Sequence, residues 1–224
     1  ILEQQITQYW NENFKVHIHA NGDKGIQQVL DFVSVNQKDN PRKDHRLTLH
    51  HMGYFADEMA DQIAKMGVEA SVNPYYLWAL ADKYAINGLG KARAENLVAL
   101  NSLAKRNVTT SYHSDFAMAP MEPLTLAWTA INRVTSGNKK VSQDQRVDTY
   151  TAMKAITISA AKTLNLEHKI GSIEAGKTAN FTILKQNPFK VEPITIKNID
   201  VLGTVHKGIF YINKSANLKP VPSS

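Results

Sequence analysis

Residues 14–33, FKVHIHANGDKGIQQVLDFV, place a strand-like run directly before a helical pattern. Apolar and polar side chains alternate over residues 14–19, which is typical of a β-strand. Ile26, Val29 and Val33 then recur with the helical period, and Asp23 is positioned to cap that helix. A strand followed by a helix is the repeating unit of a parallel sheet, so this stretch predicts an α/β fold.

The same unit recurs three more times. Strands are expected at 46–51, 68–72 and 108–112, and a helix over 57–65 is expected to end at Gly67. Four units are too few to close a (β/α)₈ barrel alone. A doubly wound sheet stays open as an alternative, although no Gly-rich phosphate-binding motif follows any of the strands.

Three further elements lie outside these units. Residues 1–12 have the pattern of an amphipathic helix. Because the chain begins inside that helix at Ile1 rather than Met, we expect a piece of a longer polypeptide. Residues 73–90, rich in Tyr and Trp, are expected to form a long loop, and residues 146–164 one further helix.

Short β-like runs separated by Gly, Pro and Asn follow the last helix, at 170–173, 180–184, 200–205 and 209–212. We therefore predict a main unit over 1–165, the strands of a small β-domain over 166–214 and a loose tail over 215–224.

Composition excludes several classes of protein. The chain of 224 residues has no Cys, which rules out disulfide scaffolds and Cys-ligated zinc sites. The net charge is +6, but the basic residues are scattered, so we expect no nucleic-acid partner. No apolar stretch approaches ~18 residues, so we expect no membrane partner either.

Five of the eight histidines fall at or just after expected strand ends: His17, His19, His50, His51 and His113. Asp115 closes the fourth strand. The carboxyl ends of parallel strands meet at one edge of the sheet, where active sites lie. Imidazole suits Zn²⁺, and a carboxylate can bind the ion or accept a proton from the water it activates. The pattern predicts a divalent metal site acting on a small-molecule substrate.

Periodicity alone leaves the ligands open. His17 and His19 share a strand face, so either could bind the ion. His50 and His51 should point to opposite faces, so at most one of them is expected to face the centre. A Ser/His/Asp nucleophile is disfavoured, because Ser114 lacks the flanking glycines of a strand–helix elbow.

An aromatic cluster stands out in the stretch that precedes the fourth strand: Tyr75, Tyr76, Trp78 and Tyr84. These side chains can form either core beneath a loop or the wall of a pocket. In the second case the stretch 73–90 predicts a moderately apolar substrate.

Four ordered motifs resemble a known family. They are HANGD at 19–23, His51 ahead of GVEASVNP at 67–74, HSD at 113–115 followed by AP at 119–120, and IGSIEAGKTANF at 170–181. In this order and spacing they are similar to the C-terminal half of amidohydrolase-superfamily enzymes of the amidohydrolase family 3, or YtcJ-like, type. The resemblance covers nearly the whole chain.

This resemblance implies the second half of a (β/α)₈ TIM barrel, strands five to eight, with part of a small β-sandwich. It implies that His19, His51 and Asp115 are metal ligands, and that Asp115 is the catalytic proton acceptor. The expected cofactor is a divalent metal, Zn²⁺ before others, as one or two ions. The resemblance also places three residues at the substrate, Tyr75, Tyr76 and His113.

The chain also departs from the family pattern. The first-strand HxH motif is absent, and so is the strand-four region that can supply a bridging lysine carboxylate. We therefore expect the isolated chain to bind metal weakly and to show no appreciable turnover. Asn180 replaces the usual Asp of the last motif, which lies in the β-domain, away from the chemistry.

The leading hypothesis is thus an amidohydrolase that cleaves an amide or cyclic amide C–N bond. One alternative is a non-catalytic half-barrel that associates with a missing half or with itself, because an unclosed barrel exposes sheet edges and an apolar face. Another is a polyanion-binding α/β domain, whose binding would fall steeply with salt. The sequence assigns neither a substrate nor a localisation.

Overall fold

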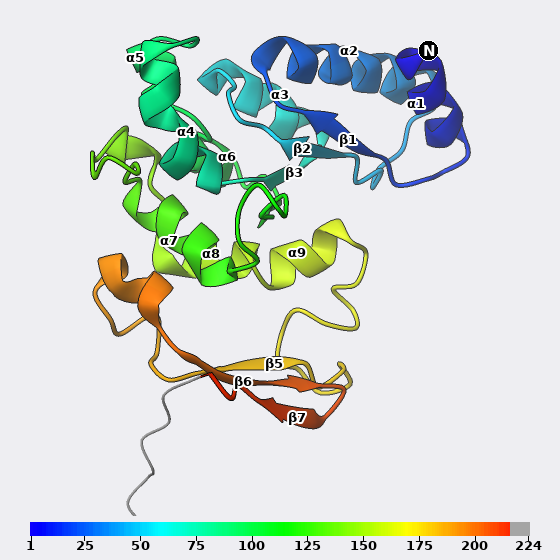
Figure 1. Cartoon of the computed structure of the whole chain (residues 1–224). Coiled ribbons are helices and arrows are strands. Elements are labelled where there is room, and N and C mark those ends of the chain that lie inside the picture. Colours follow the sequence, from blue (N-terminus) through cyan, green and yellow to red (C-terminus); the bar gives the residue numbers. More distant parts are fainter. Residues whose placement is uncertain (216–224) are drawn as a thin grey trace, which may run out of the picture.

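The computed structural model describes residues 1–215 and contains two sheets. The first has four parallel strands in the order β1-β2-β3-β4 and the second three antiparallel strands in the order β5-β6-β7 (Figure 1). The strands are β1 (His17–Ala20), β2 (Thr48–His51), β3 (Glu69–Val72), β4 (Thr110–Tyr112), β5 (Phe181–Leu184), β6 (Val201–His206) and β7 (Ile209–Ile212).

Helices connect the parallel strands. They are α1 (Leu2–Asn11), α2 (Asp23–Asp39), α3 (Asp57–Met66), α4 (Tyr75–Ile86), α5 (Lys91–Glu95), α6 (Leu100–Ala104), α7 (Pro123–Asn132), α8 (Thr149–Ala155) and α9 (Ile158–Thr163), with short 3₁₀ turns η1 (Gln143–Gln145) and η2 (Pro193–Asn198). The parallel strands lie side by side in chain order. A doubly wound sheet reverses its order at a switch point, so this order does not match that alternative.

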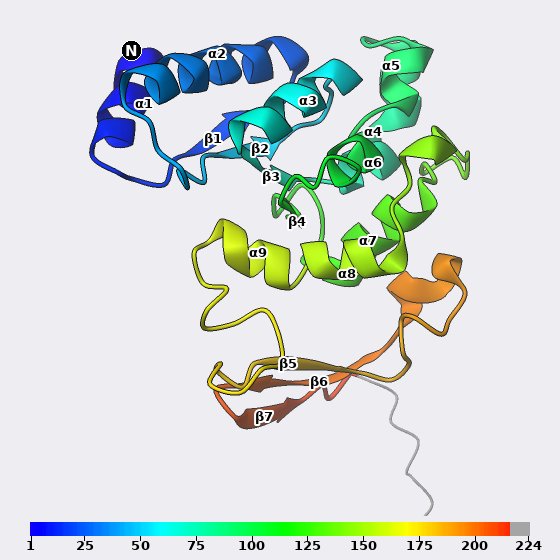
Figure 2. The ribbon, with the colours of Figure 1, turned by 180° about the vertical axis from the view of Figure 1, so that it is seen from behind.

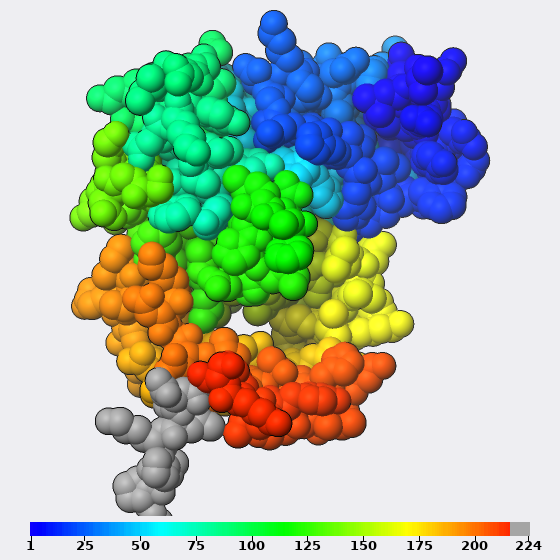
Figure 3. Space-filling view, viewed as in Figure 1, coloured from blue at the N-terminus to red at the C-terminus, as the bar shows by residue number. Residues whose placement is uncertain are grey.

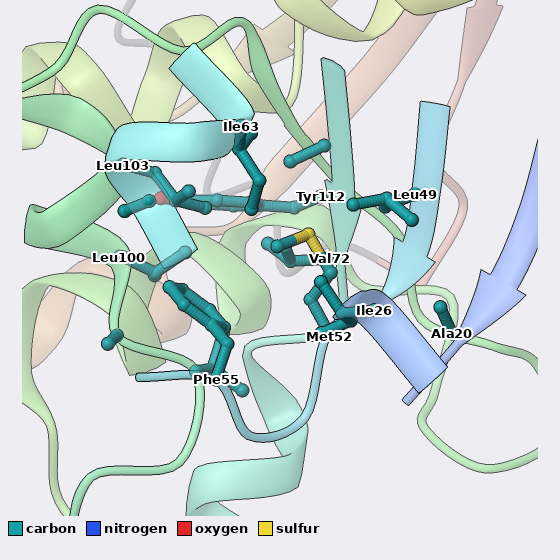
Figure 4. Packing of buried hydrophobic residues seen from close by; sticks show 14 of the residues in the cluster. Ala20, Ile26, Leu49, Met52, Phe55, Ile63, Val72, Leu100, Leu103 and Tyr112 are labelled. Atoms are coloured by element: carbon teal, nitrogen blue, oxygen red, sulfur yellow. The ribbon is translucent and has the colours of Figure 1, made fainter. Parts of the chain in front are cut away.

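The two faces of the parallel sheet differ in polarity. α2 and α3 cover one face, and α8 and α9 lie on the other side (Figures 1 and 2). Side chains from β1 to β4 and the covering helices form an apolar core in which Leu49, Val72 and Ile26 are fully buried (Figure 4). On the opposite face Ser111 Oγ lies 3.2 Å from Thr163 Oγ1 of α9. By register, His19 and His50 lie on this polar face with Ser71 and Ser111, whereas His51 pairs with Ala20 and Val72.

Most expected elements are confirmed, and Gly67 ends α3 in the left-handed conformation with φ +69°. Asp23 is the first residue of α2, and Gly22 stands at the cap position, so the expected Asp23 cap is wrong. The expected loop over 73–90 is also wrong, because α4 fills most of it. The first seven residues of α4 are apolar or aromatic, and its charged residues Asp82 and Lys83 are adjacent in sequence, so no polar side recurs with the helical period.

Two corrections concern the C-terminal third. The helix expected over 146–164 is split into α8 and α9 at Thr157, whose φ/ψ of −130°/−98° is not helical. Consecutive β-branched residues at 156–158 disfavour a continuous helix there. Residues 170–173 form no strand, since Gly171 turns the chain at φ +94°.

The antiparallel sheet forms a separate layer below the main unit, orange to red in Figure 3. It is joined to α7 through η2, because Trp128 Nε1 donates to the carbonyl oxygen of Ile194 at 2.8 Å. Every residue of β7 is exposed although successive side chains point to opposite faces. Neither face of the sheet is therefore covered at β7.

The tail expected over 215–224 lies, after its first residue, outside the described residues. None of the helices within residues 1–215 combines the length and apolar character needed to cross a membrane.

Candidate functional site

The five histidines that the sequence predicts at strand ends form one cluster, although His17 is the first residue of β1. The ring centroids of His19 and His51 lie 4.2 Å apart, and those of His17 and His50 lie 5.0 Å apart. His113 joins the two pairs, with its ring centroid 4.9 Å from that of His51 and 5.6 Å from that of His50. Side chains from β1, from β2 and from the end of β4 therefore meet at the carboxyl edge of the sheet.

The backbone of His51 explains why His50 and His51 both join the cluster. The expectation that at most one of them faces the centre assumed regular strand alternation. His51 instead has φ +74°, and Met52 follows with φ +48°. This left-handed turn ends the strand and redirects the His51 ring, so the expectation is wrong.

Burial lowers the pKa of several rings of the cluster. The pKa of His50 is lowered to about 4, first by burial and then by the neighbouring ring of His17. Burial also lowers the pKa of His51 and of His17. His17 Nδ1 and His50 Nε2 lie 2.8 Å apart, so one ring donates a hydrogen bond to the other. Neutral imidazole is the form that can bind a metal ion.

Tyr76 connects His51 with the carboxylate. Its hydroxyl oxygen lies 3.2 Å from His51 Nδ1 and 3.3 Å from Asp115 Oδ2. His51 Nδ1 and Asp115 Oδ2 lie 3.8 Å apart. An ionised carboxylate can only accept, so the single Tyr76 proton points to Asp115. The same oxygen then accepts from His51 Nδ1–H. This arrangement leaves the lone pair of His51 on Nε2, the atom available to a cation.

The loop after β4 holds Asp115 in place. Asp115 adopts φ +51°, a conformation that Asp tolerates better than most residues. The fully buried Asn73 side chain donates from Nδ2 to the carbonyl oxygen of Ser114 at 3.2 Å. Its Oδ1 accepts from the backbone N–H of Tyr75 at 3.0 Å. Asn73 therefore ties the end of β3 to the loop that carries Asp115.

The substrate-contact predictions meet different surroundings. Tyr76 is buried against the cluster, whereas Tyr75 packs on Trp78 with ring centroids 4.9 Å apart. Tyr75 thus packs on Trp78, whereas Tyr76 contacts His51. The ring of His113 lies in the cluster, and its Nε2 is buried without a hydrogen-bond partner among the described residues.

The types of donor atom in this cluster suit a divalent cation, but their arrangement does not form a complete metal site. His19, His51 and Asp115 offer two imidazoles and a carboxylate, a set typical of catalytic zinc. Yet no three His, Asp or Glu side chains within residues 1–215 are arranged to hold a metal ion. The ligand roles of the three residues therefore stay a prediction, and the structure supplies their proximity.

Sequence reasoning gave no role to two residues that shape this edge. One is Asn73, whose signal was its place at the end of the GVEASVNP segment. The other is Asn21, whose Oδ1 accepts from the backbone N–H of Gly53 at 3.0 Å. A Cβ at Gly53 would collide with that oxygen, so a larger residue there would displace the Asn21 side chain from this hydrogen bond. The contact clamps the loops that follow β1 and β2.

Known proteins are similar to this chain in sequence or in fold. Protein LONG AFTER FAR-RED 3 of Arabidopsis thaliana is 33% identical over 175 residues, which are 77% of this chain and 30% of that protein. N-substituted formamide deformylase of Arthrobacter pascens is 25% identical over 201 residues, 89% of this chain and 37% of that protein. The chain thus spans about a third of the length of these curated relatives.

A crystal structure of an uncharacterized metal-dependent hydrolase from Pyrococcus horikoshii superposes with a TM-score of 0.70 at 22% identity. The match covers 85% of this chain and 38% of that one, and it shows a shared fold. The model of the amidohydrolase family matches residues 2–210. This match confirms the resemblance seen in the motifs, and the chain belongs to the amidohydrolase family.

Proposed function

We propose that this chain is part of a metal-dependent hydrolase that cleaves a carbon–nitrogen bond other than a peptide bond, in an amide or cyclic amide. The observation that carries the proposal is the meeting of His19, His51 and Asp115 at the carboxyl ends of three strands. Membership of the amidohydrolase family supports the reaction class. A relative named for deformylation of N-substituted formamides supports a non-peptide amide.

Each side chain has a distinct role in this proposal. His19 and His51 would hold a divalent cation, with zinc as the expected ion, as one or two ions. A bound cation supplies Lewis-acid polarisation of a water and of the substrate carbonyl. Asp115 accepts the proton released by the attacking water, and Tyr76 steers its carboxylate. Tyr75, Tyr76 and His113 would bound the substrate.

The proposal includes a larger architecture. The four strands in chain order would be strands five to eight of a (β/α)₈ barrel, and β5–β7 would be part of a small β-sandwich. The proposed division is a barrel part over 1–165 and a β part over 166–214. His19 and Asp115 are exposed, which leaves the cluster open on one side. Groups from the other half of the barrel would complete the site there.

Turnover provides the test of this function. The isolated chain should bind zinc weakly and hydrolyse amides at no appreciable rate. A longer form with the upstream half should bind zinc tightly and hydrolyse amides. A longer form that holds no metal, or robust turnover by the 224 residues alone, would contradict the proposal.

A second candidate is a non-catalytic half-barrel that associates with a missing half or with a second copy. The exposed apolar strand β7 favours it, since Ile209, Phe210 and Ile212 are each at least half exposed. We expect size-exclusion chromatography of this chain to show an oligomer that the upstream half converts to a defined complex. A clean monomer would count against the half-barrel architecture.

A further inference from the structure

We propose that a pocket beside the histidine cluster holds an uncharged aromatic group of the substrate. That the bound molecule is a substrate rests on the hydrolase function proposed above. Its binding in the pocket does not depend on that function. The pocket has a volume of about 330 Å³, and we name it the tyrosine pocket. Its larger side chains are Tyr54, Tyr76, Leu80, Tyr84, Leu89 and Leu97.

The position of the tyrosine pocket links it to the site. Tyr76 belongs to both, since its ring lines the pocket and its hydroxyl contacts His51 and Asp115. Gly22 and Gly53, which also line the pocket, follow directly after β1 and β2. The pocket therefore lies at the carboxyl edge of the sheet, next to the proposed reacting centre.

The lining determines what the pocket can accept. None of the described residues that line it is charged, and its polar side chains are the three tyrosines and two asparagines. The guanidinium carbon of Arg93 lies 5.7 Å from the centroid of the Tyr54 ring, but Arg93 does not line the pocket. A charged group placed in the pocket would therefore lose water without gaining an oppositely charged residue in the lining. An aromatic ring would instead pack against tyrosine rings in offset or edge-on geometry. The volume lies at the lower end of the usual range for ligand pockets, which fits a single ring.

A pocket at the opposite end of the sheet shows the contrast. Its volume is about 390 Å³, and its lining includes Lys15, Arg42, Asp44, Arg46 and Glu167. These groups are already engaged, as in the pair of Arg46 with Glu167 at 2.7 Å. These two pockets of the described residues thus differ, since charged side chains line this one and none lines the tyrosine pocket.

One wall of the tyrosine pocket is held rigidly. Asn21 accepts from the backbone N–H of Gly53 through its side chain and from that of Tyr54 through its carbonyl oxygen, the latter at 3.1 Å. These bonds fix the loop that carries Tyr54. A wall fixed in this way costs little ordering when a ligand binds.

The test uses two matched probes, acetanilide, which is uncharged, and 4-acetamidobenzoate, which adds one carboxylate. Saturation-transfer NMR with the 224-residue chain measures binding without turnover. We expect acetanilide to bind at least tenfold more tightly than 4-acetamidobenzoate. Tyr84→Glu, at a partly exposed position of the pocket, should weaken acetanilide at least tenfold. Ile86→Glu is the matched control, because it adds an exposed charge to the same helix outside the pocket lining, and it should leave binding unchanged.

Leu80→Trp, which fills the pocket without adding charge, should reproduce the loss and guards against a folding defect in Tyr84→Glu. Equal binding of the two probes, or unchanged binding in both Tyr84→Glu and Leu80→Trp, would overturn the inference. His51→Ala separates it from the proposed function, because this variant should lose zinc while it retains acetanilide. A chain that binds acetanilide in this pocket but never binds metal would contradict the hydrolase proposal and leave the pocket assignment standing.

Discussion

The Tyr76 hydroxyl donates a hydrogen bond to Asp115 across 3.3 Å, which joins helix α4 to the loop after β4. The same hydroxyl oxygen is within 3.2 Å of His51 Nδ1, so one phenol sets the position of two proposed site residues. Burial, and then the Asp115 charge, raises the pKa of Tyr76 to about 12. Tyr76 therefore keeps its proton at neutral pH and can serve as a permanent donor.

Tyr76→Phe should remove this control over His51. In the wild-type chain, the ¹⁵N shifts of the His51 ring should report a proton on Nδ1 and a lone pair on Nε2. In the variant, this preference should decrease, and the free energy of unfolding should fall by about 1 kcal/mol. Tyr75→Phe is the matched control, because Tyr75 packs on Trp78. An unchanged His51 tautomer in Tyr76→Phe would refute the assigned direction of the hydrogen bonds.

Arg133 should be essential for stability. Its side chain is buried and donates to the carbonyl oxygens of Val98 at 2.8 Å and of Leu97 and Glu95 at 3.0 Å each. Arg133→Met would remove the side-chain donor to the carbonyl oxygens of Leu97 and Glu95, while that of Val98 keeps its bond from the backbone N–H of Leu100. We therefore expect a loss of about 2–4 kcal/mol of unfolding free energy in a urea titration. A loss below 1 kcal/mol would show that water replaces the guanidinium.

The link between α3 and α6 should depend on pH. Hydrogen bonds from Arg106 hold the pKa of Asp57 and of Asp61 below its ordinary value. A carboxylate whose pKa is lower in the folded state than in the unfolded state stabilises the fold at pH values above its unfolded-state pKa of about 4. This stabilisation is lost as the pH falls through the folded-state pKa. Arg106→Met should therefore lower the melting temperature at pH 7 and have little effect near pH 2.

Lys65→Met is the control for that measurement, since Lys65 is an exposed cation of the same helix α3. It should leave the melting temperature unchanged at both pH values. A deficit in Arg106→Met that persists undiminished at pH 2 would mean that packing of the arginine stem, and not its ion pairs, provides the stabilisation.

The sequence revealed the repeating units because local signals encode them. The alternation over 14–19 and the glycine at 67 depend on nearby residues alone, and the structure confirms a strand and a helix end at these places. The helix α4 was missed because its polar residues Asp82 and Lys83 do not recur with the helical period, so packing against the rest of the fold is needed to identify it. Local periodicity therefore predicts amphipathic helices far better than helices without a regular polar face.

The candidate site was predictable in its membership but not in its geometry. Expected strand ends pointed to all five histidines, since parallel strands bring their carboxyl ends together, although His17 proves to be the first residue of β1. The positive φ of His51 and the contact of Tyr76 with Asp115 arise from tertiary packing, which no spacing rule contains. That is why strand alternation wrongly separated His50 from His51, and why Tyr75 and Tyr76 could not be distinguished.

The central claim is that His19, His51 and Asp115 share one cation. The most direct measurement is a Zn²⁺ titration of this chain by calorimetry, beside His19→Ala, His51→Ala and Asp115→Ala. The control is His206→Ala, which removes an exposed imidazole from β6, far from the cluster in sequence. We expect weak binding that each of the three substitutions reduces at least tenfold and that His206→Ala leaves intact. Identical zinc affinity in all five proteins would contradict the claim.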